Sequence, residues 1–173
     1  MDIDINKFGR TNVIFISEQN YTKKLIGIVK KLICSFPKIC YITINQPYVS
    51  IVELLEKNGI KTENIFFIDP ITPEREQRPH KNCIFVSSPA ALTELGVSIT
   101  TLLYTKKFDC FILDSLNTLM VYNKEWEVLR FLHTFVTKLK TKNCMAIITC
   151  LEAEKESEVV KNLAMFIDKF LFI

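Results

Sequence analysis

Hydrophobic residues are distributed along this chain in two patterns that follow one another. Short runs rich in β-branched and aromatic residues are typical of strands, and longer segments with apolar residues three or four positions apart are typical of helices. The predicted strands cover residues 12–16, 38–44, 65–70, 83–87, 107–114, 146–149 and 170–173. The predicted helices cover residues 21–35, 47–58, 88–103, 123–140 and 152–166. This alternation predicts an α/β fold, a three-layer α/β/α sandwich with a mainly parallel sheet.

No linker, repeat or low-complexity segment separates these elements. A chain of 173 residues can bury one proper hydrophobic core, so residues 1–173 are expected to form a single domain. The one long polar connection, residues 71–81, contains two prolines, two arginines and a histidine. Connections of this length in a compact domain are functional or mobile, and the role of this one stays open.

The most informative stretch is the apolar run that ends in Asp114-Ser115. A run without alternation predicts a strand buried on both faces, in the middle of a parallel sheet. Ligands of such sheets lie beyond the carboxyl ends of the strands, and a carboxylate there suits a magnesium–phosphate site. Asp114 could equally begin the turn and cap the following segment, Leu116 to Tyr122, so both interpretations stay open.

Composition argues against several classes of protein. The hydrophobic fraction of 49% and the charged fraction of 24% are those of a folded chain. Lys+Arg 22 against Asp+Glu 19 gives a net charge of +3, too small to indicate nucleic acid or a membrane surface. No apolar run approaches the ~20 residues that span a bilayer, and the acidic, alternating residues 1–5 do not resemble a signal peptide. We therefore expect a cytoplasmic protein that does not associate with membranes.

Metal and nucleophile chemistry finds little support. The six cysteines include no C-x-x-C pair and lie in or beside apolar segments, so we expect small buried hydrophobes, not zinc ligands or disulfides. His80 and His133 have no second ligand at metal-binding spacing. No G-x-S-x-G motif is present, which argues against an acyl-transfer hydrolase. Trp126 and His133 lie on the less apolar side of their helix, where a partner contact centred on Trp126 fits better than catalysis.

Several of these segments together resemble one superfamily. They are residues 85–89, 92–95, 111–116, 128–132, 147–149 and 167–173. In their order, and in Asp-Ser-Leu after a central strand, they are similar to the RecA/KaiC superfamily of P-loop ATPases, above all to archaeal KaiC-like proteins. The resemblance spans most of the chain from Asn12 onward and implies a RecA/KaiC-like sandwich. It also implies a site for ATP and magnesium at the carboxyl ends of the strands.

The phosphate loop of that superfamily is missing. Such a loop needs glycines whose backbone N–H groups converge on phosphate, followed by lysine and Ser/Thr. Here residues 17–24 contain no glycine, are too short for the motif, and include Glu18. A residual nucleotide site would consist of Asp114 and Ser115, with Thr22 and Lys23 from the first helix, and Asp114 would be the only magnesium ligand among the candidates.

The general base is missing as well. The superfamily tends to place a carboxylate after its second strand, where this chain has Asn45-Gln46-Pro47. An amide does not accept a proton from water near neutral pH, so general-base catalysis is lost at this position. The chain therefore resembles a degenerate member of the superfamily, a pseudo-ATPase without catalytic residues.

The leading expectation is a catalytically inactive KaiC-like module that binds a protein, either a homologous ATPase or another copy of itself. A regulatory role, such as in signal transduction, follows from the resemblance only, and no cofactor is expected. One alternative is an ATP-binding protein or ATPase with an atypical phosphate site that uses ATP and magnesium. The other is a DNA-binding accessory protein, based on the scattered lysines, although no aromatic stacking platform is evident.

Overall fold

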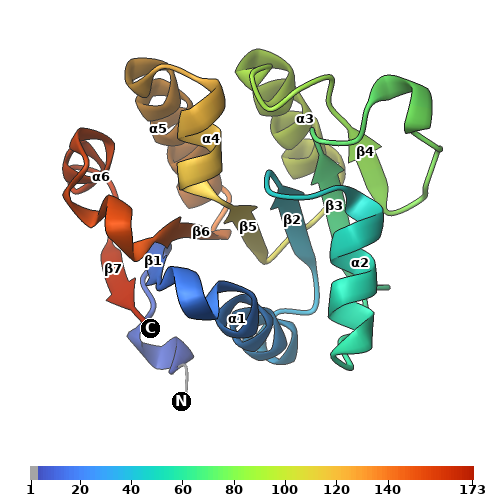
Figure 1. The fold of residues 1–173 in the computed structure, drawn as a ribbon, viewed down its shortest axis with the longest axis horizontal. Helices are drawn as coiled ribbons and strands as arrows, with labels where there is room; N and C mark the ends of the chain where they lie inside the picture. The colour runs from blue at the N-terminus through green and yellow to red at the C-terminus, as the bar shows by residue number, and fades with distance from the viewer. Residues whose placement is uncertain (1–3) are drawn as a thin grey trace.

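A seven-stranded sheet forms the middle layer of the protein in a computed structural model that describes residues 4–173. All of the strand pairs are parallel, and the strand order is β4-β3-β2-β5-β6-β1-β7 (Figure 1). The strands are β1 Thr11–Ile16, β2 Ile39–Thr43, β3 Ile65–Asp69, β4 Cys83–Phe85, β5 Cys110–Asp114, β6 Met145–Leu151 and β7 Lys169–Phe172.

Helices cover both faces of this sheet. On one face lie α1 Tyr21–Ser35 and α2 Tyr48–Lys57; on the other lie α3 Leu92–Thr105, α4 Leu116–Tyr122, α5 Glu125–Thr141 and α6 Glu158–Leu163 (Figure 1). Short 3₁₀ turns are η1 Ile5–Lys7, η2 Glu18–Asn20, η3 Glu74–Glu76 and η4 Glu152–Glu156. The predicted three-layer α/β/α sandwich is confirmed.

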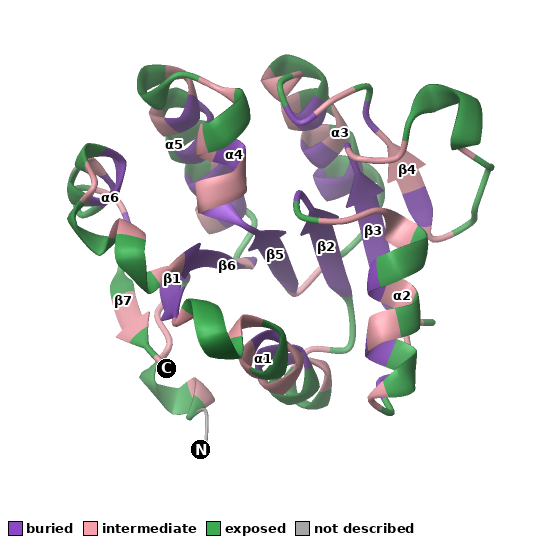
Figure 2. Ribbon diagram, viewed as in Figure 1, coloured by how far each residue is buried: buried purple, intermediate pink, exposed green. Residues whose placement is uncertain are grey.

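Strand β5 lies in the centre of the sheet, as its continuous apolar run predicts. Phe111 and Leu113 pack into the layer of α3 to α6, whereas Cys110 and Ile112 pack into the layer of α1 and α2. Figure 2 shows the central strands as buried along their length. Because successive side chains of a strand point to opposite faces, only an uninterrupted apolar run can fill both layers.

Within residues 4–173, no helix is long and apolar enough to cross a membrane.

Two predicted helices differ from the structure. The segment 152–166 divides into η4 and the short α6, because its buried side chains begin only at Val159, and Ser157 caps α6 by accepting from the Val160 N–H at 3.3 Å. Helix α3 begins at Leu92 and not at residue 88, because the Ser88 hydroxyl accepts the Ala90 N–H at 3.1 Å and forms a separate turn. The apolar segment after Ser115 forms α4.

The cysteine prediction is confirmed at five positions and wrong at one. Cys40, Cys83, Cys110, Cys144 and Cys150 are buried, and Cys34 is exposed. Cys34 lies near the end of α1, whose buried side chains end at Leu32. Cys34 therefore lies on the side of the last turn that faces solvent.

The polar connection 71–81 starts from a buried carboxylate at the end of β3. Asp69 accepts the backbone N–H groups of Ile71 at 2.7 Å and Thr72 at 2.9 Å with one oxygen. Its other oxygen accepts the Tyr48 N–H at 2.7 Å and the Thr72 hydroxyl at 2.5 Å. Further along, the His80 ring lies 5.0 Å from the Tyr48 ring. Asp69 thereby joins the start of α2 to the start of the connection.

Replacing Asp69 tests this connection between α2 and residues 71–81. In Asp69→Ala, three N–H groups and one hydroxyl lose their acceptor, so we expect the free energy of unfolding to fall by about 2–5 kcal/mol. Urea denaturation followed by circular dichroism measures it. Asp69→Asn keeps one oxygen and should lose less; equal losses in the two variants would contradict this role for the carboxylate.

Candidate functional site

Asp114 lies at the carboxyl end of β5, in the layer that α1 covers. It is paired in the sheet with Thr43 at the end of β2, and the neighbouring β6 carries Thr149 close to its own end. The side chains of Asp114 and Thr149 are both fully buried. The structure therefore places Asp114 at the edge of the sheet where ligands of open α/β folds bind.

Four neutral donors surround the Asp114 carboxylate. One oxygen accepts the Tyr21 hydroxyl, the Asn45 side-chain N–H at 2.8 Å and the Thr149 hydroxyl at 3.1 Å. The other oxygen accepts the Tyr41 hydroxyl at 2.5 Å. These donors come from α1, β2, the turn after β2 and β6, so the carboxylate connects four parts of the chain.

Asn45 extends this network to the start of α4. Its amide oxygen accepts the Ser115 hydroxyl at 3.0 Å and also the Thr118 hydroxyl. The Asp114–Ser115 peptide bond is cis. Asn45 thus uses its amide hydrogens on the carboxylate and its amide oxygen on the α4 hydroxyls, which explains why an amide fits here where a carboxylate would repel Asp114.

Burial sets the ionisation of the network. It raises the pKa of the Asp114 carboxyl above the ordinary 3.8, because the four hydrogen bonds only partly offset the lost hydration. Burial, together with the charge of Asp114, also raises the pKa of the Tyr21 and Tyr41 hydroxyls above the ordinary 10.0. Both phenols therefore stay protonated and keep donating to the carboxylate.

The structure brings together only part of the predicted site. Asp114 and Ser115 lie side by side and are fully buried. Thr22 and Lys23 are exposed on the first turn of α1, and the donors to Asp114 within the described chain do not include them. Tyr21, their neighbour, provides the inward-facing side chain. The residues missed from the sequence are Tyr21, Tyr41 and Thr149. Thr149 had a signal, as a polar residue near the end of a buried strand, whereas Tyr21 is the first residue of α1 and Tyr41 lies in the middle of β2.

These residues do not fit a magnesium nucleotide. Magnesium keeps several waters and needs accessible carboxylate oxygens, but both Asp114 oxygens face protein donors and the side chain has no exposed area. The turn before α1 forms the 3₁₀ segment Glu18–Asn20, which has no glycine. Among residues 4–173, no three His, Cys, Asp or Glu side chains lie close enough together to hold a metal ion.

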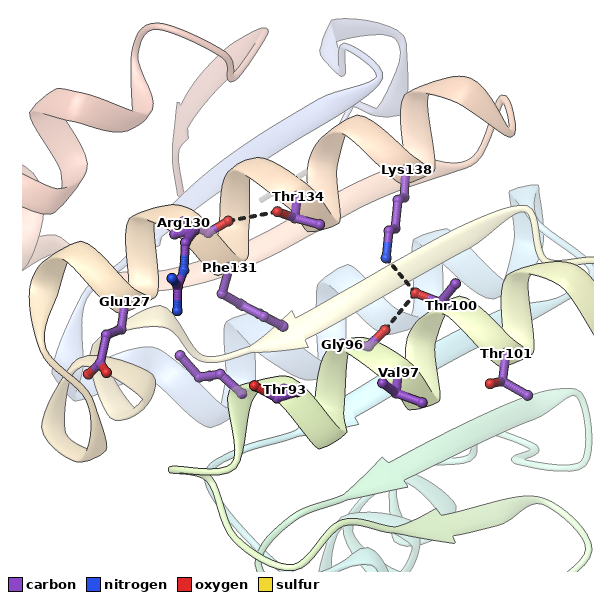
Figure 3. Close-up of a pocket in the computed structure, with 11 residues that line it drawn as sticks. Thr93, Gly96, Val97, Thr100, Thr101, Glu127, Arg130, Phe131, Thr134 and Lys138 are labelled. Atoms are coloured by element: carbon purple, nitrogen blue, oxygen red, sulfur yellow. Dashed lines mark hydrogen bonds between the residues drawn. The ribbon is translucent and has the colours of Figure 1, made fainter.

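A second feature is an open groove between α3 and α5, with a volume of about 480 Å³ (Figure 3). Arg130 and Glu127 line the α5 side, and Val97 lies on the α3 side. Lys138 donates to the Thr100 hydroxyl at 2.6 Å and joins the two helices at one end of the groove. This groove lies on the outer surface of the helical layer opposite α1, apart from Asp114.

Gly96 lines the same groove from within α3. A glycine inside a helix costs about 0.5–1 kcal/mol relative to alanine. Apart from the two neighbouring residues and the backbone of its own helix, no atom lies within 4 Å of the position that a Gly96 Cβ would occupy, so packing against the rest of the protein does not require glycine. The absence of a side chain here leaves the groove deeper.

Comparison with known proteins decides the family. A family model described as a family of unknown function, DUF7504, matches residues 46–171. The chain belongs to DUF7504. No curated protein matches the sequence.

Solved structures share the fold of this DUF7504 chain. One is KaiC-like protein PH0186 from Pyrococcus horikoshii OT3, with a TM-score of 0.68 at 12% identity over 95% of this chain and 71% of that one. Another is uncharacterized protein PH0321 from Pyrococcus horikoshii in complex with an unknown peptide, with a TM-score of 0.67 at 13% identity over 94% and 76%. The KaiC-like fold expected from the sequence is confirmed.

The raised pKa of Asp114 predicts how the stability of the DUF7504 chain depends on pH. The folded state holds the Asp114 proton to higher pH than the unfolded chain, so this residue lowers the free energy of unfolding as the pH rises from 3.8 through the raised value. Asp114→Asn cannot ionise and lacks this contribution. Chemical denaturation of both proteins at a series of pH values should show the stability of the wild type falling relative to the variant. Parallel pH profiles would contradict the assignment.

Proposed function

We propose that this chain is a KaiC-like module that does not hydrolyse ATP and that acts by binding a partner protein. The observation that carries the proposal is the closed environment of Asp114. Tyr21 enters from the first residue of α1, and its phenol donates to the carboxylate that a magnesium ion would need. Opening that site would leave a fully buried carboxylate and a half-buried tyrosine without their partners, at a cost of several kcal/mol.

The absence of a glycine-rich phosphate loop and of a general base supports the same conclusion. No glycine stands between β1 and α1, so the backbone there lacks the residues that let successive N–H groups converge on phosphate. Glu18, which is exposed in that turn, would repel a triphosphate. Asn45 binds Asp114 with its amide hydrogens and is not a base. The module therefore keeps the fold of an ATPase without its chemistry.

The groove between α3 and α5 is the surface that we propose for the partner. Val97, which lines the groove, is 61% exposed, and Trp126, which contacts the lining residue Arg130, is 55% exposed. Arg130 lies over the Trp126 ring at 5.0 Å, which holds a cation beside an aromatic anchor. Tryptophan and arginine are the residues most often found at the energetic centre of interfaces.

The residues that line the groove indicate what kind of partner would complement it. A segment with an apolar side chain for the space above Gly96 and a carboxylate for Arg130 would complement it. That the structurally similar PH0321 is described in complex with a peptide supports peptide binding on this fold. A homologous ATPase or a second copy of this chain would each be such a partner.

Calorimetry tests the first half of the proposal. Titration of the purified protein with ATP and magnesium should give no binding heat, because Asp114 is not accessible and no loop presents amides to phosphate. The direct contradiction would be magnesium-dependent binding together with hydrolysis that is lost in Asp114→Asn. Circular dichroism of the same samples controls for folding.

Substitution of Gly96 tests the second part of the proposal, that a partner protein binds in the groove between α3 and α5. Gly96→Arg places a long side chain in the groove, and Ser50→Arg places the same residue on the exposed surface of α2 as a matched control. Affinity capture from native cell extract with quantitative mass spectrometry, repeated with the purified partner, should show binding at least tenfold weaker in Gly96→Arg and unchanged in Ser50→Arg. Equal binding by both variants would place the partner elsewhere.

The same glycine predicts a stability effect. Gly96→Ala should raise the free energy of unfolding by about 0.5–1 kcal/mol, because alanine restricts the unfolded chain and its Cβ meets no atom within 4 Å beyond the adjacent residues and its own helix backbone. Urea denaturation measures the change. A loss of stability would mean that the groove is closed over Gly96 in solution. That result would contradict the proposal that the groove is open to a partner.

A further inference from the structure

A second groove crosses the opposite edge of the sheet, at the amino ends of the strands. It consists of two adjoining hollows of about 430 Å³ and about 530 Å³ that share residues 105–108. One continues along the starts of β2, β3 and β4, and the other along the segment between α5 and β6. Asp114 lies at the other end of β5, so this groove is separate from the network described above.

Positive charge is concentrated in this groove. Its lining includes four exposed lysines: Lys38, Lys106, Lys107 and Lys142. Two acids also line it, Glu63 and Asp109. The Asp109 carboxylate accepts the backbone N–H of Lys38 at 2.9 Å, so one of the two negative charges is directed at the backbone. The excess of positive over negative charge in the groove favours an anionic ligand.

Aromatic rings accompany the lysines. The Nζ of Lys142 lies 4.0 Å from the centre of the Tyr104 ring, and the Nζ of Lys106 lies 4.0 Å from the centre of the Phe66 ring. Tyr104 is still 71% exposed, so the ring face away from Lys142 is open to solvent. A planar group that stacked on this face would lie beside a fixed cation. The sequence alone did not reveal this platform, because Tyr104 is on α3 whereas Lys142 lies in the turn after α5.

The backbone beneath these side chains is held rigidly. The Asp109 N–H donates to the Lys38 carbonyl at 2.9 Å, and the Met145 N–H donates to the Asp109 carbonyl at 2.9 Å. Arg10 donates to the Asn143 side chain at the far end of the groove and brings a further cation there. The two backbone bonds continue the sheet ladder outward, beneath the lysine side chains.

We propose that this groove binds single-stranded nucleic acid. A lysine at the C-terminal end of a helix can also stabilise that helix through its dipole. This role explains the positions of Lys106 and Lys142, but not those of Lys38 and Lys107. Phosphodiesters match the lysines, and an unpaired base matches the open face of Tyr104. An acidic peptide would satisfy the lysines but leave the ring unused, and the bases of a duplex are stacked away from it. The inference does not depend on the proposed protein partner.

Fluorescence anisotropy of the intact chain with a labelled oligonucleotide of about 12 nucleotides tests this proposal. Binding should weaken with salt, with a slope of log K against log[salt] near −3, since four lysines contribute about 0.7 each on single strands. The matching duplex should bind at least several-fold more weakly. DNA and RNA of the same sequence, measured in parallel, determine which of the two is preferred.

Three variants separate charge from stacking. Lys107→Ala should reduce the magnitude of the slope by about 0.7. Tyr104→Leu, which keeps apolar bulk at an exposed position, should weaken binding about tenfold and leave the slope unchanged. Lys155→Ala, on the exposed η4 segment, removes the same charge elsewhere and should change neither quantity.

Several results would overturn the proposal. They are absence of binding at low salt, an equal effect of Lys155→Ala and Lys107→Ala, and full affinity in Tyr104→Leu. Equal competition by poly-glutamate or by vesicles of anionic phospholipid would mean that the groove responds to charge alone. Circular dichroism confirms that each variant is folded before its affinity is compared.

Discussion

The hydrogen bonds that enclose Asp114 are the constraint on which the rest of this structure depends. A carboxylate without exposed area is tolerated only when its oxygens are satisfied, and here Tyr21, Tyr41, Asn45 and Thr149 satisfy them. These donors hold the start of α1 against the ends of three strands, at the edge of the sheet where ligands of open α/β folds bind. The carboxylate at the end of β5 thus joins α1, β2, the turn after β2 and β6.

Much of the fold could be predicted from the pattern of apolar residues. Helix α1 has the predicted bounds of 21–35, and β5 lies in the middle of the sheet, because both patterns depend on burial along a single element. The errors occurred where a local polar side chain competes with the helix. Ser88 forms its own turn before α3, and Ser157 caps a helix that begins only where buried side chains become available.

The candidate site was predictable only in part. A polar residue at the end of a buried run identified Asp114, and its neighbour Ser115 shares the network. Its principal donor, Tyr21, is 93 positions away in sequence, and the spacing of residues does not indicate which side of the first helical turn faces the sheet. The expected Lys23 therefore points outward, while Tyr21 points inward. The contact between Lys142 and the Tyr104 ring was not predicted either, because it joins residues from separate elements of the chain.

Direct observation of the two phenol protons is the most decisive test of the account. In nuclear magnetic resonance spectra, the hydroxyl protons of Tyr21 and Tyr41 should be shifted downfield and exchange slowly with water, because both donate to a buried carboxylate. Tyr21→Phe and Tyr41→Phe assign the two signals. The account predicts that both signals persist unchanged when ATP and magnesium are added in excess. Loss or displacement of these signals on that addition would show that the Asp114 site opens to nucleotide, and would contradict it.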